Sequence, residues 1–234
     1  GTAGTVLWSA GVAVFLGALL WTLRGNLTGR ETATGEANAD RRPVDRLANA
    51  FVPVALCYLA VGTGVLLAGW GLPRVAPLLA AGTAGLLIFA LGFRLLPRFL
   101  VATPPRSLVA VVLPSGALGP LLIAVDLYGG VWFRIGALAE AVAVVGFALS
   151  FAALFRRSER RRVGFYGVLA GAGGGVVGVG LGLVFAFHGA TPALVAAHLR
   201  ANLLGFLGLT VVGVTYQFYP PAVGTLPGAS DRTA

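Results

Sequence analysis

The sequence contains no lysine and no methionine, and its 234 residues include one cysteine, two histidines and only 11% charged residues. Because lysine is absent, no cofactor can be held here as a lysine Schiff base. The single cysteine, Cys57, excludes an internal disulfide, and its place in an apolar run predicts a small buried residue. A methionine-free chain starting at Gly1 is expected of a processed protein or a fragment. The low charge is unlike that of soluble domains, in which about a quarter of residues are charged.

Seven apolar runs occupy most of the chain, and each is long enough to cross a bilayer, which takes about 20 helical residues. They comprise residues 5–23, 47–69, 75–93, 107–127, 132–155, 163–187 and 193–218. The sequence therefore predicts an all-α polytopic transmembrane helix bundle of seven spans, forming one domain over residues 1–234. We expect a multi-pass protein of the cell membrane with lipid around it. No nucleic-acid partner is expected, because the basic residues lie in short clusters that flank the apolar runs.

The arginines between the runs predict an orientation. One side of the predicted bundle holds Arg24, Arg30, Arg41, Arg42, Arg46, Arg94, Arg98, Arg106, Arg156, Arg157, Arg160, Arg161, Arg162 and Arg232, and the other holds Arg74 and Arg134. By the positive-inside rule, the N-terminus is outside and the C-terminus is cytoplasmic. Residues 24–46 are polar and are predicted to form a mobile cytoplasmic loop. Retinal proteins have this layout, but the absence of lysine excludes them.

Small residues predict how the helices pack. Two glycine stripes run along the sixth predicted span at four-residue spacing, and such stripes let helix backbones approach closely. The stripes are Gly167, Gly171 and Gly175, and Gly174, Gly178 and Gly182. We therefore expect this helix to lie wedged between others. The fourth predicted span contains Pro114, Gly116, Gly119 and Pro120, a composition that predicts kinks.

Three ionisable residues fall at membrane depth, where a charge is costly unless it is paired or solvated. They are Glu140 in the fifth predicted span and His198 and Arg200 in the seventh, and all three belong to the same predicted half of the membrane. An ion pair between Glu140 and Arg200 is the simplest way to hold both charges. These residues form the candidate site.

The two residues of the seventh span point in different directions, because positions two apart differ by about 200° around a helix. His198 shares a face with Asn202 and Gly205, and this small, polar stripe can accept a flat ligand. The alternative is that His198 bonds a carbonyl or hydroxyl group of the next helix. His188, at the end of the sixth span, is expected to be an interfacial, solvated histidine.

Residues 197–206 read Ala-His-Leu-Arg-Ala-Asn-Leu-Leu-Gly-Phe, and the segment continues through Thr210 and Gly213 to Tyr216. This stretch resembles the histidine helix of haem-copper-type membrane proteins, specifically the oxidase subunit I-like and NnrS-like groups. In those groups a helix reading approximately A-H-x-H-x-N-x-x-G-(F/W) presents histidines to metal centres. Residues 92–99, Gly-Phe-Arg-Leu-Leu-Pro-Arg-Phe, also look like a motif of NnrS-like chains.

The resemblance implies that His198 is an axial ligand to a haem iron. Arg200 replaces the second histidine of the motif, and it cannot ligate a metal because it has no free lone pair. It is left to pair with a haem propionate or with Glu140. The chain's two histidines are too few for an oxidase-type copper centre beside a haem. One haem remains, held by His198, with His188 or a partner's residue as the other ligand.

The sequence is compatible with three functions. The first is a haem-binding protein with an accessory role in respiratory or nitrogen-oxide metabolism and no catalytic activity of this chain alone. The family has more spans than this chain, so the resemblance also implies other membrane subunits, or the remainder of a longer chain, as partners. The second is a small-molecule permease lined by Glu140, His198, Arg200 and the kinked fourth span. The third is a structural subunit of a membrane complex.

Overall fold

The computed structural model describes residues 2–25, 36, 39–127, 129–160 and 162–219. Over these ranges the chain forms seven helical spans that are long and apolar enough to cross a membrane, and it contains no strand. The spans are α1 (Thr2–Leu23), α2 (Arg42–Leu67), α3–η2–α4 (Leu72–Ala76, Pro77–Gly85, Leu86–Leu100), α5 (Arg106–Val125), α6 (Val131–Arg157), α7 (Val163–His188) and α8–η3–α9 (Pro192–Arg200, Ala201–Gly208, Leu209–Phe218). The predicted all-α bundle of seven apolar helices is confirmed. The middle of the predicted 24–46 loop lies outside the described residues.

Two spans are longer than the apolar runs from which they were predicted. The second begins at Arg42 instead of residue 47, and the third runs on to Leu100, past residue 93. The extra turns carry charged residues, which run-length analysis assigns to loops. They are helical because they pair with each other: Arg98 of α4 donates to Asp45 of α2, with N–O distances of 3.2 and 2.6 Å. Asp45 is buried, so this ion pair joins the two helices.

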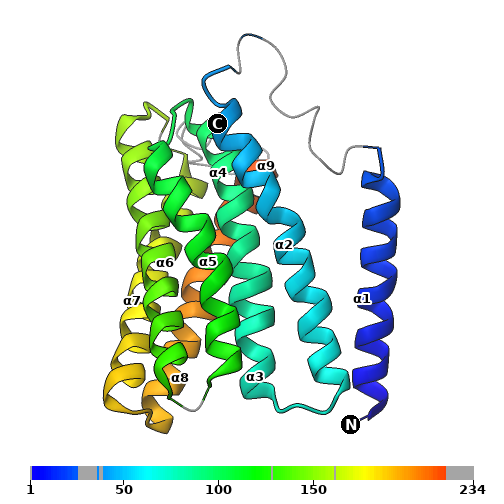
Figure 1. The fold of residues 1–234 in the computed structure, drawn as a ribbon. Helices are drawn as coiled ribbons and strands as arrows, with labels where there is room; N and C mark the ends of the chain where they lie inside the picture. The colour runs from blue at the N-terminus through cyan, green and yellow to red at the C-terminus, as the bar shows by residue number, and fades with distance from the viewer. Residues whose placement is uncertain (1, 26–35, 37–38, 128, 161, 220–234) are drawn as a thin grey trace, which may run out of the picture.

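The helices stand roughly parallel, with neighbours in the sequence side by side (Figure 1). In the packed part of the bundle, α5 packs on α6 and α6 on α7, and α7 in turn packs along the whole α8–η3–α9 span. Helix α2 packs against η2 and α4. Helix α1 contacts chiefly α2 and stands at the edge of the bundle, where its large apolar side chains are exposed.

Four phenylalanines fill the centre of the bundle. Phe89 of α4 lies 5.3 Å from Phe147 of α6 between ring centroids, and Phe206 of η3 lies 5.8 Å from Phe89. Phe93 contacts Phe147 edge-on at 5.5 Å. All four rings are buried. This cluster ties together three spans that are distant in the sequence and holds the seventh span against the rest.

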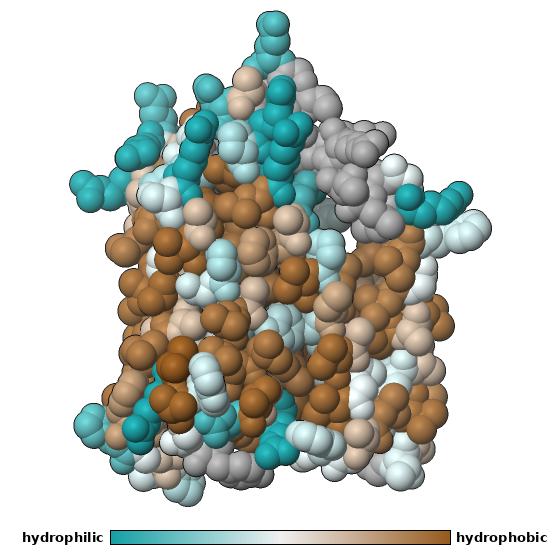
Figure 2. Space-filling model, viewed as in Figure 1, coloured by the Kyte–Doolittle hydropathy of each residue, from teal (hydrophilic) through white to brown (hydrophobic). Residues whose placement is uncertain are grey.

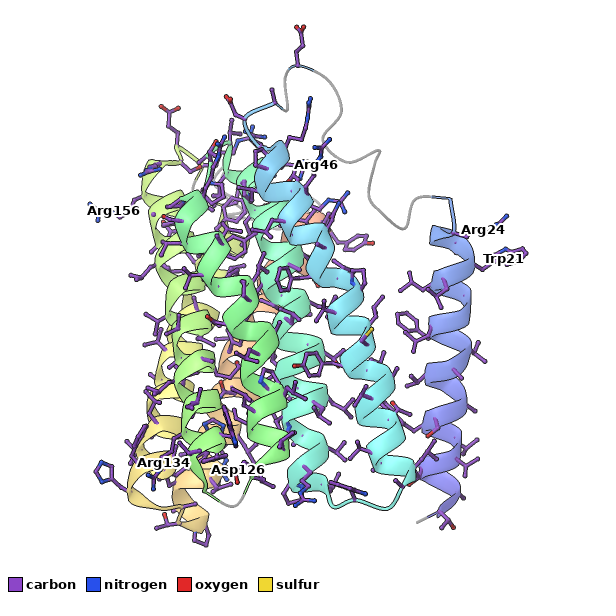
Figure 3. All side chains as sticks on the ribbon, viewed as in Figure 1. Trp21, Arg24, Arg46, Asp126, Arg134 and Arg156 are labelled. Carbon is purple, nitrogen blue, oxygen red and sulfur yellow. The ribbon has the colours of Figure 1, made fainter. Side chains whose placement is uncertain are left out.

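Charged residues lie mainly at the two ends of the bundle, and most of them lie at one end. Figure 2 shows a brown apolar belt with hydrophilic residues gathered mainly at one end. That end, called here the arginine-rich end, holds Arg24, Arg46 and Arg156, whereas Arg134 and Asp126 lie at the opposite end (Figure 3). Arginines also stack on tryptophans near both ends, with guanidinium-to-ring distances of 4.1 Å for Arg24 and Trp21 and 4.7 Å for Arg74 and Trp70. Such pairs are typical of membrane interfaces.

The glycines of α7 face the seventh span closely, as their spacing predicts. A methyl group on Gly174 would lie 2.9 Å from the Cα of Gly205, and one on Gly213 would lie 2.6 Å from the carbonyl oxygen of Gly164. At Gly175 a methyl group would meet both Val144 of α6 and Phe206 of η3, each at 2.9 Å, and α7 packs along α6 as well. Helix α7 is therefore wedged between two others, and backbone contact joins it to α8–η3–α9.

The prediction for Cys57 is wrong, because its side chain is exposed on the outside of α2. In a membrane bundle the lipid-facing surface is as apolar as the core, so apolar neighbours do not show which way a residue points. Tyr58, the next residue, points inward instead and donates a hydrogen bond to the carbonyl oxygen of Ala117 on α5.

Candidate functional site

His198 lies on α8, a helix whose start is defined by its own residues. Thr191 caps it by accepting a hydrogen bond from the backbone N–H of Leu194 at 3.3 Å, and Pro192 occupies the first turn. His198 comes six residues after Pro192, about 9 Å along the axis at 1.5 Å per residue. Its half-buried ring crosses to α7, where Nδ1 lies 2.8 Å from the carbonyl oxygen of Gly178.

Gly182 leaves the space in which the ring of His198 packs against α7. A methyl group on Gly182 would lie 3.0 Å from Cε1 and 3.2 Å from Nδ1 of His198, so only glycine leaves room for the ring in its present position. The ring of Phe185 meets the imidazole edge-on, with centroids 5.0 Å apart. The imidazole is thus fixed on three sides by residues of one helix.

Asn202 completes the arrangement one turn further along. Its Nδ2 donates to the carbonyl oxygen of His198 at 2.9 Å and lies 3.3 Å from Nδ1 and 3.5 Å from Nε2 of the same residue. The predicted stripe of His198, Asn202 and Gly205 therefore exists, and glycines of α7 cover it. The close packing of α7 takes the place that a flat ligand would need between these two helices.

The hydrogen bond to Gly178 determines the chemistry of the ring. A carbonyl oxygen only accepts, so Nδ1 carries the proton and Nε2 keeps its lone pair. Nε2 has no donor closer than the Asn202 amide at 3.5 Å. Metal-ligating histidines are oriented in the same way, with one ring nitrogen bonded to a carbonyl and the other free to ligate.

The structure does not bring Glu140 and Arg200 together. Arg200 is exposed, and Oε1 of Glu140 is buried without a hydrogen-bond partner, so the predicted ion pair is not formed. The reason is the angle of about 200° between positions two apart on a helix: the side chain of His198 points into the bundle, so that of Arg200 points outward. An ion pair is formed instead by Arg98 and Asp45, at the arginine-rich end of the bundle.

His188 does not share a site with His198. It is the last residue of α7 and is exposed, as expected of an interfacial histidine. It follows Gly178 by ten residues, about 15 Å along the helix. Its exposed side chain lies at the end of α7, three residues beyond Phe185, whose ring contacts the imidazole of His198. No group of three His, Cys, Asp or Glu side chains that could hold a metal occurs in the described part of the chain.

Sequence analysis missed the wide, π-helical turns that interrupt two spans. Segment η3 starts directly after Arg200 and includes Asn202, and η2 occupies Pro77–Gly85 of the third span. The two segments contact each other. Such turns are common at functional sites. Pro77 and the glycines at 82, 85, 205 and 208 were the available signal, but they also occur in regular membrane helices.

Comparison with known proteins adds no family to this picture. No protein-family model, curated protein or solved structure matches the chain.

Proposed function

We propose that this chain is an integral membrane protein that binds one haem through Nε2 of His198, with an accessory role in respiratory or nitrogen-oxide metabolism. The observation that carries the proposal is the 2.8 Å hydrogen bond between Nδ1 and Gly178, which leaves the other ring nitrogen with a lone pair. The resemblance of residues 197–206 to the histidine helix of haem-copper-type proteins supports the same assignment.

The residues present supply one axial ligand, and because α7 covers the face of His198, Asn202 and Gly205, a haem would have to reach Nε2 from outside the contact between α7 and α8. His188 is exposed at the end of α7, so we propose that a second axial ligand comes from a partner. Arg200 is exposed two residues from His198 and has no acidic partner in the described residues, which leaves its guanidinium available to a propionate. A bound haem would supply one-electron transfer or binding of a small gas. This chain contributes the histidine, its orientation and an apolar surround.

The proposal predicts a haem absorption band that depends on His198. Protein purified in detergent from haem-supplied cells is expected to show a Soret band, and His198→Ala is expected to abolish it. Gly182→Ala, which displaces the imidazole, is expected to lower haem affinity about tenfold. Gly180→Ala is the matched control, since a methyl group there meets nothing within 4 Å.

A colourless wild-type protein, or a band unchanged in His198→Ala, would contradict haem binding. The first result would favour the second candidate, a small-molecule permease. That candidate is supported by Glu140 at membrane depth beside α5, a helix interrupted by Pro114 and Pro120. Exposed His188 serves as an additional control, because His188→Ala is expected to leave the band intact.

We also propose that the arginine-rich end faces the cytoplasm, which puts the N-terminus and His198 in the outer half of the membrane. The division of arginines between the two ends supports this orientation. In a Cys57→Ser background, a membrane-impermeant maleimide is expected to label Ala190→Cys in intact cells and Glu159→Cys only after lysis. Both positions are exposed, at opposite ends of the bundle. The reverse pattern would overturn the orientation.

A further inference from the structure

Glu140 is an acidic residue deep in the bundle that the haem proposal does not use. It lies nine residues after Val131, the start of α6, which is about 14 Å along the helix and close to the middle of a bilayer about 30 Å thick. The side chain is half-buried as a whole, but its Oε1 is fully covered and has no hydrogen-bond partner. An acidic group at this depth requires an explanation.

The side chain lies against α5, a helix that contains Pro114 and Pro120. A methyl group on Gly119 would lie 2.6 Å from Oε1 and 2.7 Å from Cγ of Glu140, so glycine makes the space that the carboxyl group occupies. Pro120 follows directly and has no N–H to donate, which interrupts the hydrogen bonding of α5 at this point. The carboxyl group therefore faces a turn of α5 in which proline removes one backbone hydrogen bond.

The groups around this carboxyl do not neutralise a negative charge. Tyr58 of α2 is close enough to interact electrostatically with Glu140, but its hydroxyl donates to the carbonyl of Ala117. No arginine in the described chain forms an ion pair with Glu140. An unpaired carboxylate in an apolar interior costs far more than a neutral carboxylic acid there, because the acid carries no net charge.

We propose that Glu140 is a proton-binding site at membrane depth, separate from His198, in which the carboxyl group takes up a proton within the α5–α6 interface. The ligand is a proton because a lone carboxyl group lacks the six or so oxygen ligands that a metal cation of the calcium or magnesium type requires. The site does not depend on haem, so it can be tested in colourless protein.

The test uses a reagent that adds to protonated carboxyl groups in membranes. Dicyclohexylcarbodiimide is hydrophobic, and it converts a carboxylic acid to a stable N-acylurea that retains all atoms of both reactants. Full-length protein in lipid vesicles is expected to gain the mass of one carbodiimide on the peptide that contains Glu140. Raising the pH is expected to slow the reaction, and Glu140→Gln is expected to abolish it.

Glu159→Gln is the matched control, since Glu159 is exposed at the arginine-rich end and its loss is expected to leave the labelling unchanged. Infrared spectroscopy gives a second measurement on unmodified protein, in which the carbonyl stretch of a protonated acid is expected in wild type and absent in Glu140→Gln. The amide variant has nearly the shape of the protonated acid and is expected to fold. Folded wild-type protein that shows neither labelling at Glu140 nor this carbonyl stretch would overturn the proposal.

Discussion

Arg98→Leu is expected to lower the free energy of unfolding by about 3 kcal/mol, the lower end of the cost of leaving one member of a buried ion pair without its partner, because Arg98 itself is 31% exposed. Asp45, the member left behind, is only 2% exposed, and it accepts hydrogen bonds from both terminal nitrogens of Arg98. The leucine variant would leave a carboxylate buried between α2 and α4. Thermal or denaturant unfolding in detergent measures the effect.

Two further variants distinguish the effect of losing the Arg98–Asp45 ion pair from the general effect of removing an arginine. Arg46→Leu removes an exposed arginine from the same end and is expected to change stability little. The double variant Asp45→Leu/Arg98→Leu is expected to recover much of the loss, because no charge is left buried without a partner. If Arg98→Leu were no more destabilising than Arg46→Leu, the ion pair would not hold α2 and α4 together.

Gly213→Ala is expected to destabilise the protein by about 1–3 kcal/mol through overpacking. The added methyl group would lie 2.6 Å from the carbonyl oxygen of Gly164 and 2.8 Å from the backbone nitrogen of Val168. Both atoms are backbone, so no side chain can rotate away, and α7 and α9 must separate. The measurement is again unfolding in detergent.

Gly173→Ala is the control for this prediction, because a methyl group there meets nothing within 4 Å and alanine favours the helix. It is expected to be neutral or slightly stabilising. Equal effects of Gly213→Ala and Gly173→Ala would show that the α7–α9 backbone contact contributes nothing.

The seven spans were predictable because the length of an apolar run is set by bilayer thickness, whatever the helices pack against. The ends of the spans were not predictable in the same way. Asp45 and Arg98 look like loop residues in the sequence and become helical because each has the other as partner. A pairing between residues 53 positions apart leaves no local signal.

The site was predictable in part. Spacing placed His198, Asn202 and Gly205 on one face, and the structure shows that face against α7. The spacing also predicted that Arg200 turns away from His198. It did not predict that Arg200 is exposed or that Glu140 faces α5. Depth along a helix can be counted from sequence, whereas the rotation of one helix toward another depends on packing. The same limit explains the wrong prediction for Cys57.

The central claim is that the imidazole of His198 ligates a haem iron. Its most direct test is to remove this side chain and supply free imidazole from solution. His198→Gly is expected to lose the Soret band of the wild-type protein, and added imidazole is expected to restore it by occupying the space of the missing side chain. A His198→Gly protein that keeps its band without imidazole, or a wild-type protein that never shows one, would contradict haem ligation by His198.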